Sequence, residues 1–244
     1  MHICSVEEAE AEFAAAGRGS ALSISAWASP GYPKVLAAAE DAPPLIGLRG
    51  DAAVLQCPMV AVIRSRNASA LGLRFTESLA RDLGEAGLVV VSGLARGIDA
   101  RAHQATLATG TVAVLAGGHE RIYPSENGPP LERLVESGAA LSEMPIACEP
   151  RGRDFPRRNR IVSGLARGVV VIEAARGSGS LITARFAVEQ GREVFAVPGL
   201  PLDPRAAGTN VLIRQGATLV TSAEHVIEIL PPIIADAAAL SEAG

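Results

Sequence analysis

The residues that are best suited to bind a ligand form the hexapeptide Phe-Pro-Arg-Arg-Asn-Arg at positions 155–160. The surrounding segment, from Arg151 to Arg167, contains six arginines and one acid, Asp154, although the whole chain has a formal net charge of −4. Guanidinium groups bind phosphate oxygens two at a time, and an adjacent aromatic ring offers a face on which an unpaired base stacks. The segment therefore favours single-stranded nucleic acid as a partner, with Phe155 as the stacking ring.

Two glycine-rich segments are further candidates for phosphate contact. Residues 92–99 read Ser-Gly-Leu-Ala-Arg-Gly-Ile-Asp, and residues 177–180 read Gly-Ser-Gly-Ser. Glycines let the backbone approach a ligand, and free N–H groups at a helix N-terminus bind anions. Alternatively, both segments are plain strand-to-helix turns, with Ser180 as an N-cap and Asp99 as a favourable dipole partner. The functional interpretation gains from convergence, because five arginines are expected at the same edge: Arg66, Arg96, Arg158, Arg160 and Arg185.

The chain has no residue pattern typical of covalent or metal catalysis. Its four histidines are scattered and its three cysteines form no Cys-x-x-Cys pair, so neither a zinc site nor a disulfide framework is indicated. His103 is expected to be a satisfied, half-buried histidine, and Glu173 is expected to pair with a neighbouring arginine. Both the Gly-x-Gly-x-x-Gly fingerprint and the Gly-x-x-x-x-Gly-Lys-Ser/Thr motif are missing. We expect no cofactor and no metal.

The composition bounds the class of protein. A chain of 244 residues buries a sizeable core as one large domain, or as one domain with a small appendage. Plentiful small aliphatic residues with 3% aromatics suit a parallel sheet that is covered on both faces. The chain has no apolar run near 18 residues and no visible secretory signal. Together with the unpaired cysteines, these features predict a cytoplasmic protein that does not span a membrane.

Hydrophobic periodicity predicts alternating strands and helices after residue 58. Strands are predicted at residues 60–63, 88–91, 111–115, 139–141, 169–172, 193–197 and 217–220. Helices are predicted at residues 71–86, 97–109, 126–137, 157–166, 181–190, 210–215 and 223–230. Such alternation indicates the α/β class, with an extended Rossmann-like fold, a mostly parallel twisted sheet and helices on both faces.

The remaining segments divide the chain into three predicted parts. Residues 1–57 are expected to form a small N-terminal extension of strands and short helices, including a helix at 6–16, that packs on the core. Residues 58–230 are expected to form the Rossmann-like core. The alanine-rich residues 231–244 are expected to be a tail or a cut linker.

Several uncommon strings occur along the chain in a fixed order: Val-Ser-Gly-Leu-Ala-Arg-Gly-Ile-Asp-Ala (91–100), Ala-His (102–103), Tyr-Pro-Ser-Glu-Asn (123–127), Phe-Pro-Arg-Arg-Asn-Arg-Ile (155–161), Gly-Ser-Leu-Ile-Thr-Ala-Arg (179–185) and Val-Pro-Gly (197–199). In these strings the chain resembles the DNA-processing protein A (DprA/Smf) family. The resemblance implies a bacterial cytoplasmic protein that binds single-stranded DNA, protects it during natural transformation and loads the recombinase RecA onto it.

The resemblance also implies an extended Rossmann core, a homodimer and a DNA-binding protein rather than an enzyme. Many family members carry an N-terminal sterile-alpha-motif-like domain and a C-terminal winged helix. The chain is expected to lack both, as a fragment would.

Carried over motif by motif, the resemblance implies a set of DNA-binding residues drawn from four segments. They are Arg64, Arg66, Ser92, Gly93, Arg96, Gly97, Phe155, Arg157, Arg158, Asn159, Arg160, Gly179, Ser180, Thr183 and Arg185. One departure concerns the first loop, where the family has a glycine and this chain has Arg64. That arginine either blocks the approach of a phosphate to the backbone or adds a clamp of its own.

Two other functions compete with DNA binding. Phosphoribohydrolases of the lysine-decarboxylase-like (LOG) type cleave nucleoside monophosphates on a related architecture, with the string Pro-Gly-Gly-x-Gly-Thr-x-x-Glu. This chain has Ala-Arg-Gly-Ser-Gly-Ser-Leu-Ile-Thr at residues 175–183 and lacks that glutamate, which disfavours the enzyme. A purely structural domain with internally paired arginines is disfavoured by the shortage of acids at residues 151–167.

Overall fold

The computed structural model describes residues 22–63 and 68–230. In this part of the chain the strands form a single sheet in the order β1-β2-β6-β5-β4-β3-β7-β8-β9. The strands are β1 (Leu22–Ala26), β2 (Leu45–Gly50), β3 (Met59–Ile63), β4 (Val89–Ser92), β5 (Thr111–Val114), β6 (Ala139–Ser142), β7 (Gly168–Val171), β8 (Glu193–Ala196) and β9 (Thr218–Leu219). Strand β2 pairs antiparallel with β1 and β6, and the other neighbouring pairs are parallel.

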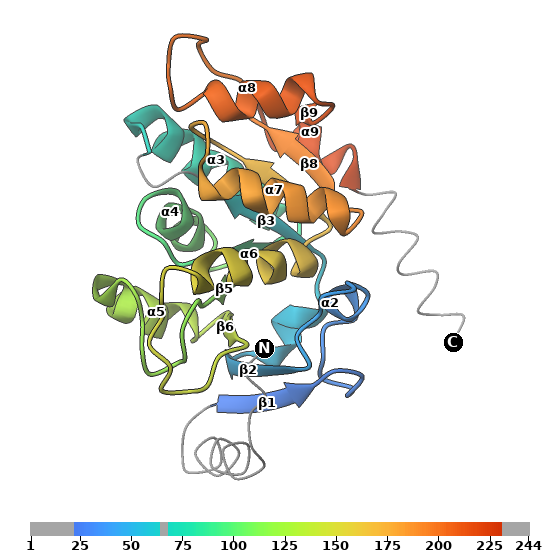
Figure 1. The fold of residues 1–244 in the computed structure, drawn as a ribbon, viewed down its shortest axis with the longest axis vertical. Helices are drawn as coiled ribbons and strands as arrows, with labels where there is room; N and C mark the ends of the chain where they lie inside the picture. The colour runs from blue at the N-terminus through green and yellow to red at the C-terminus, as the bar shows by residue number, and fades with distance from the viewer. Residues whose placement is uncertain (1–21, 64–67, 231–244) are drawn as a thin grey trace.

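Helices cover both faces of this sheet. They are α2 (Lys34–Ala37), α3 (Ala70–Glu85), α4 (Ile98–Ala105), α5 (Gly128–Leu134), α6 (Asp154–Leu165), α7 (Gly179–Glu189), α8 (Ala207–Arg214) and α9 (Glu224–Ile227), with 3-10 turns η1 (Ala52–Gln56) and η2 (Ser125–Asn127). Helices α3, α4, α5 and α9 pack on one face, and α2, α6, α7 and α8 on the other. Figure 1 shows α6 and α7 side by side over the sheet. The predicted fold class is confirmed.

The core follows the two-residue period of the strands. In β3, Val60 and Val62 pack with α3 and α4, whereas Ala61 and Ile63 pack with α6 and α7. All five residues of β3 are buried. A central parallel strand therefore needs an unbroken apolar run, because both of its faces are covered by helices.

Most helix boundaries differ from those predicted by one or more residues, and two of the differences have a local reason. Helix α6 begins at Asp154 rather than at residue 157, and the Asp154 carboxylate accepts the N–H of Arg151 (2.7 Å) at this N-terminus. Proline is tolerated in a first helical turn, so Pro156 does not delay the start. Helix α4 ends at Ala105 rather than at residue 109, where the Thr106 hydroxyl binds the carbonyl oxygen of Ala102 (2.9 Å). Phe155 consequently lies in a helix, not in the loop before it.

Residues 22–57 add the β1-β2 hairpin to the edge of the sheet beside β6. Helix α2 packs against α6, and the buried Tyr32 hydroxyl donates to the carbonyl oxygen of Pro43 (2.6 Å). The boundary at residue 58 stays a prediction. The predicted helix at 6–16 and the predicted tail at 231–244 lie outside the described residues. Within the described ranges, no helix is both long enough and apolar enough to cross a bilayer.

Candidate nucleic-acid interface

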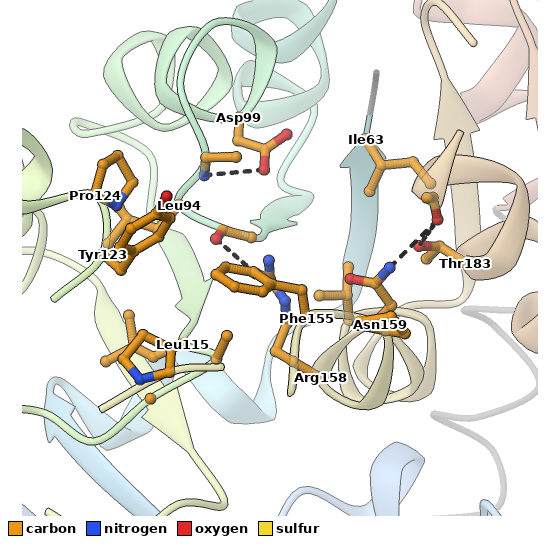
Figure 2. Close-up of a pocket in the computed structure, with 18 of the residues that line it drawn as sticks. Ile63, Leu94, Asp99, Leu115, Tyr123, Pro124, Phe155, Arg158, Asn159 and Thr183 are labelled. Atoms are coloured by element: carbon orange, nitrogen blue, oxygen red, sulfur yellow. Dashed lines mark hydrogen bonds between the residues drawn. The ribbon is translucent and has the colours of Figure 1, made fainter. Parts of the chain in front are cut away.

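A cavity of about 720 Å³ lies at the carboxyl ends of the parallel strands, the edge at which open α/β sheets bind ligands. It is lined by the end of β3, the loops after β4 and β5, the start of α6 with the residues just before it, and the first turns of α7. Figure 2 shows these segments around the cavity. Eight of the predicted site residues are thereby brought together: Gly93, Arg96, Phe155, Arg158, Asn159, Gly179, Ser180 and Thr183.

Phe155 reaches the cavity from the first turn of α6. Its ring lies against the ring of Tyr123, with centroids 5.5 Å apart and planes inclined by 66°. Figure 2 shows the two rings beside each other although they come from different segments. Edge-to-face pairs of this kind are favourable, so the contact holds both rings in place at the wall of the cavity.

Arg158 is a buried residue beneath this aromatic pair, with 7% of its surface exposed. One guanidinium nitrogen, Nη1, donates to the carbonyl oxygens of Gly93 (2.5 Å) and Val114 (2.6 Å). Burial lowers the pKa of this guanidinium, and the charge of Asp99 partly offsets the shift. Arg158 therefore joins the ends of β4 and β5 as part of the cavity floor, which differs from the exposed phosphate clamp that the sequence predicts.

Gly93 is required by this arrangement. A Cβ at that position would lie 2.2 Å from Nη1 of Arg158, a distance that no real contact tolerates. The missing side chain makes room for the guanidinium, in addition to any room it leaves for a ligand.

The N-terminus of α7 forms the opposite wall. Ser178 occupies the N-cap position, whereas Ser180, the predicted N-cap, lies buried in the first turn with its hydroxyl 2.6 Å from that of Ser178. The amide of Asn159 donates to the carbonyl oxygen of Gly179 (3.3 Å) and so ties α6 to α7. The Thr183 hydroxyl is bonded to the same oxygen (3.4 Å). Ser178, Gly179, Ser180 and Thr183 thereby bring three hydroxyl groups and the start of α7 to the cavity.

Arg157 and Arg160 do not line the cavity. Both bind one carboxylate, that of Glu143, with Arg157 Nη2 at 3.1 Å and Arg160 in a closer contact. Arg160 also donates to the carbonyl oxygen of Asp41. The side chains of Glu143 and Arg160 are 5% and 13% exposed, so this pair is largely desolvated, whereas Arg157 is exposed. The acid that neutralises these arginines comes from before residue 151, outside the arginine-rich segment 151–167.

Arg96 and Arg185 are exposed arginines with acidic neighbours. Arg96 lines the cavity and pairs with Glu126, and both side chains are more than half exposed. Arg185 pairs with Glu189 one turn along α7 (3.4 Å) and does not line the cavity. Exposed pairs of this kind are worth little, so the Arg96 guanidinium is available to exchange its partner for a phosphate.

Ser92 and Gly97 stabilise the backbone around the cavity but do not contact it. The buried Ser92 hydroxyl donates to the carbonyl oxygen of Val62 (2.6 Å). Gly97 precedes α4 with φ of +83°, a conformation that favours glycine. Neither residue lines the cavity. Arg64 and Arg66 lie outside the described residues.

Three polar residues near the cavity serve the framework. Asp99 accepts the N–H of Ala95 (3.1 Å) at the start of α4, as a first-turn acid should. Glu173 accepts from the backbone N–H of Ser69 (2.9 Å) and from its hydroxyl, so within residues 22–63 and 68–230 its hydrogen-bonded partner is the start of α3, and Arg205 interacts with it through charge alone. His103 is buried rather than half-buried; its Nδ1 lies 2.7 Å from the Thr111 hydroxyl, but its Nε2 has no hydrogen-bond partner, so the histidine is only partly satisfied. Burial, with a smaller contribution from the Arg158 charge, lowers the pKa of His103 to about 3.

Among the cavity residues that were not predicted as site residues, Arg121 and Tyr123 carry a guanidinium and an aromatic ring suited to DNA. The string Tyr-Pro-Ser-Glu-Asn at 123–127 drew attention to Tyr123 as part of a resemblance, but no sequence pattern assigned it a role. Arg121 stands beside Glu120 without any motif, so nothing local distinguished it. Within the described residues, no group of three or more histidine, cysteine or acidic side chains is placed to hold a metal ion.

Comparison with known proteins identifies the family. The sequence model of the family "DNA recombination-mediator protein A" matches residues 23–231, which is most of the chain. The chain belongs to this family. The predicted family is thereby confirmed, and the cavity described above is a feature of a DNA recombination-mediator protein A chain.

Individual relatives agree with this placement. The chain is 45% identical to Protein Smf of Escherichia coli over 82% of its own length and 54% of that protein. It is 43% identical to DNA processing protein DprA of Bacillus subtilis, over 82% of its own length and 68% of the relative. The chain thus spans between about half and about two thirds of the length of these relatives.

Two solved structures share the fold. DNA processing protein A from Streptococcus pneumoniae superposes with a TM-score of 0.84 at 39% identity, covering 90% of this chain and 77% of the other. DNA processing protein A from Helicobacter pylori, described for its single-stranded DNA binding mode, superposes with a TM-score of 0.78 at 29% identity, covering 87% and 96%.

Proposed function

We propose that this chain binds single-stranded DNA in the cavity at the carboxyl edge of its sheet, without sequence preference. The observation that carries the proposal is the meeting of two aromatic rings with three arginines, Arg96, Arg121 and Arg158, in one cavity. Among the residues that the structure describes, one acid, Asp99, lines it with them. Base stacking on rings and electrostatic attraction of the backbone are the two terms that hold unpaired strands.

The relatives support the same ligand. The family description names recombination mediation, and the Helicobacter pylori protein, which superposes over most of this chain, is described as binding single-stranded DNA. From family membership we further propose that the chain works in the cytoplasm as a homodimer, protects incoming DNA during natural transformation and loads RecA onto it. Light scattering measures the dimer, and RecA-dependent strand exchange measures the loading.

The first test is fluorescence anisotropy with labelled oligonucleotides, single-stranded against double-stranded, at several salt concentrations. We expect preference for the single strand and an affinity that falls steeply with salt. Phe155→Ala should cost about 1–3 kcal/mol of binding free energy with little change in the salt slope, because stacking neutralises no phosphate. Phe75→Ala, at a half-buried ring on α3 outside the cavity, is the matched control.

The same protein preparation tests the alternative enzyme. A phosphoribohydrolase would release free base from nucleoside monophosphates, which chromatography detects. Release of base together with absent single-strand binding would refute the proposed function. Binding that is insensitive to salt would refute the electrostatic part of it.

A further inference from the structure

The loop between β5 and η2 forms a wall of the cavity that the sequence motifs leave without a function. It contributes Arg121, Ile122, Tyr123 and Pro124 to the cavity lining. We infer that Arg121 and Tyr123 are DNA-binding residues, with Tyr123 stacking a second base next to the one on Phe155 and Arg121 binding the phosphate between them. This inference rests on the proposed function and adds a second subsite to it.

The wall is a preformed structure. The N–H of Gly118 donates to the carbonyl oxygen of Cys148 (2.8 Å), and the N–H of Glu120 donates to that of Ile146 (3.0 Å). The Ser142 hydroxyl donates to the carbonyl oxygen of Gly117 (2.7 Å). These bonds tie the loop to β6 and to the segment that follows it, so the backbone that carries Arg121 and Tyr123 is held in place by hydrogen bonds. A braced site loses less conformational entropy when a ligand binds.

Arg121 is the arginine of this cavity whose charge is uncommitted. Arg96 pairs with Glu126, and Arg158 is bonded to two carbonyl oxygens. Arg121 is exposed, and within residues 22–63 and 68–230 its side chain has neither an ion pair nor a hydrogen bond. A phosphate that approaches it displaces no intramolecular partner. The binding free energy of that contact is therefore not reduced by the loss of an internal ion pair or hydrogen bond.

Tyr123 offers a second ring at a fixed angle. It is 62% exposed, and its plane is inclined by 66° to that of Phe155. One flat base cannot stack on two rings that are so far from parallel. Each ring therefore receives its own base, and the edge-to-face contact sets the direction in which the strand turns between the two bases. Figure 2 shows Tyr123 on the side of Phe155 away from Asn159 and Thr183, so the second base extends the site toward the β5 loop.

The test uses the full chain and oligothymidylate. Tyr123→Ala should weaken binding by about 5- to 100-fold with an unchanged salt slope, and Tyr123→Phe should retain most of the affinity. Arg121→Ala should reduce the slope of log K against log salt by about 0.7, the value for one phosphate on a single strand, and Arg121→Lys should keep it. Arg133→Ala is the matched control: this exposed arginine lies in the last turn of α5, outside the cavity lining.

A double variant tests whether the two rings bind one base together or one base each. If the rings hold different bases, the losses of Phe155→Ala and Tyr123→Ala multiply in the double variant; a double variant no weaker than Phe155→Ala alone would overturn the inference. Wild-type binding by both the Arg121→Ala and the Tyr123→Ala variant, beside a weakened Phe155→Ala, would also overturn it and leave the proposed function standing. Failure of the unaltered chain to bind oligothymidylate would refute the proposed function itself.

Discussion

Replacement of Arg158 distinguishes two roles for this residue, a structural role in the cavity floor and direct binding of a phosphate. Its Nη1 makes two hydrogen bonds to carbonyl oxygens in a site that is 7% exposed. Hydrogen bonds from a charged donor are worth about 1.5–3 kcal/mol each, and their loss leaves two buried acceptors without a donor. Part of this is offset because a buried charge is removed. We therefore expect Arg158→Ala to lower the free energy of unfolding by about 3–5 kcal/mol.

The same replacement should weaken DNA binding without changing its dependence on salt. Without Arg158, the ends of β4 and β5 lose the bridge between Gly93 and Val114, so affinity should fall at every salt concentration while the salt slope stays within error. Arg158→Lys keeps the charge but lacks the planar fork, so it should lose stability as well. Urea unfolding and salt titrations measure the two quantities. The opposite result would be an unfolding free energy equal to that of the unaltered chain, with a salt slope lowered by about 0.7 in Arg158→Ala and restored in Arg158→Lys. That result would refute a structural role for Arg158 in the cavity floor and would show that it binds a phosphate.

Two further predictions concern buried titratable groups. Glu143→Gln should weaken the hold on Arg157 and Arg160; loss of a largely buried partner should cost about 2–4 kcal/mol of stability, while the exposed Arg157 becomes free to add up to one phosphate to the salt slope. An unchanged unfolding free energy would contradict the conclusion that Glu143 forms a largely desolvated ion pair with Arg160. His103 and His119 have folded pKa values lowered by burial to about 3 and about 4, so the unfolded chain takes up protons first. Stability should therefore be intact above about pH 6.5 and should fall toward pH 4, by up to about 1.4 kcal/mol per pH unit for each histidine. His103→Asn should flatten this acid limb in urea unfolding, and an equally steep limb would argue against a buried neutral histidine.

Much of the fold was predictable because it depends on local pattern. The apolar run of β3 and the helical spacing of α3 report two different periods, and alternation of such elements leaves few topologies for a parallel sheet. The location of the cavity followed from the same reasoning, since the loops after β4 and β7 must meet at the carboxyl edge. Boundaries were less accurate where one side chain decides them, as the carboxylate of Asp154 does at the start of α6.

The chain by itself determined that a ring, arginines and glycine-rich turns would gather at one edge of a parallel sheet, since each follows an element whose type the pattern reveals. Only the tertiary structure decided which of those arginines keep a charge for a ligand. Glu143 neutralises Arg157 and Arg160, Arg158 is buried against carbonyl oxygens, and Arg121 is exposed at the wall. Charge pairing depends on distance through space and on desolvation, and neither is a function of separation along the chain.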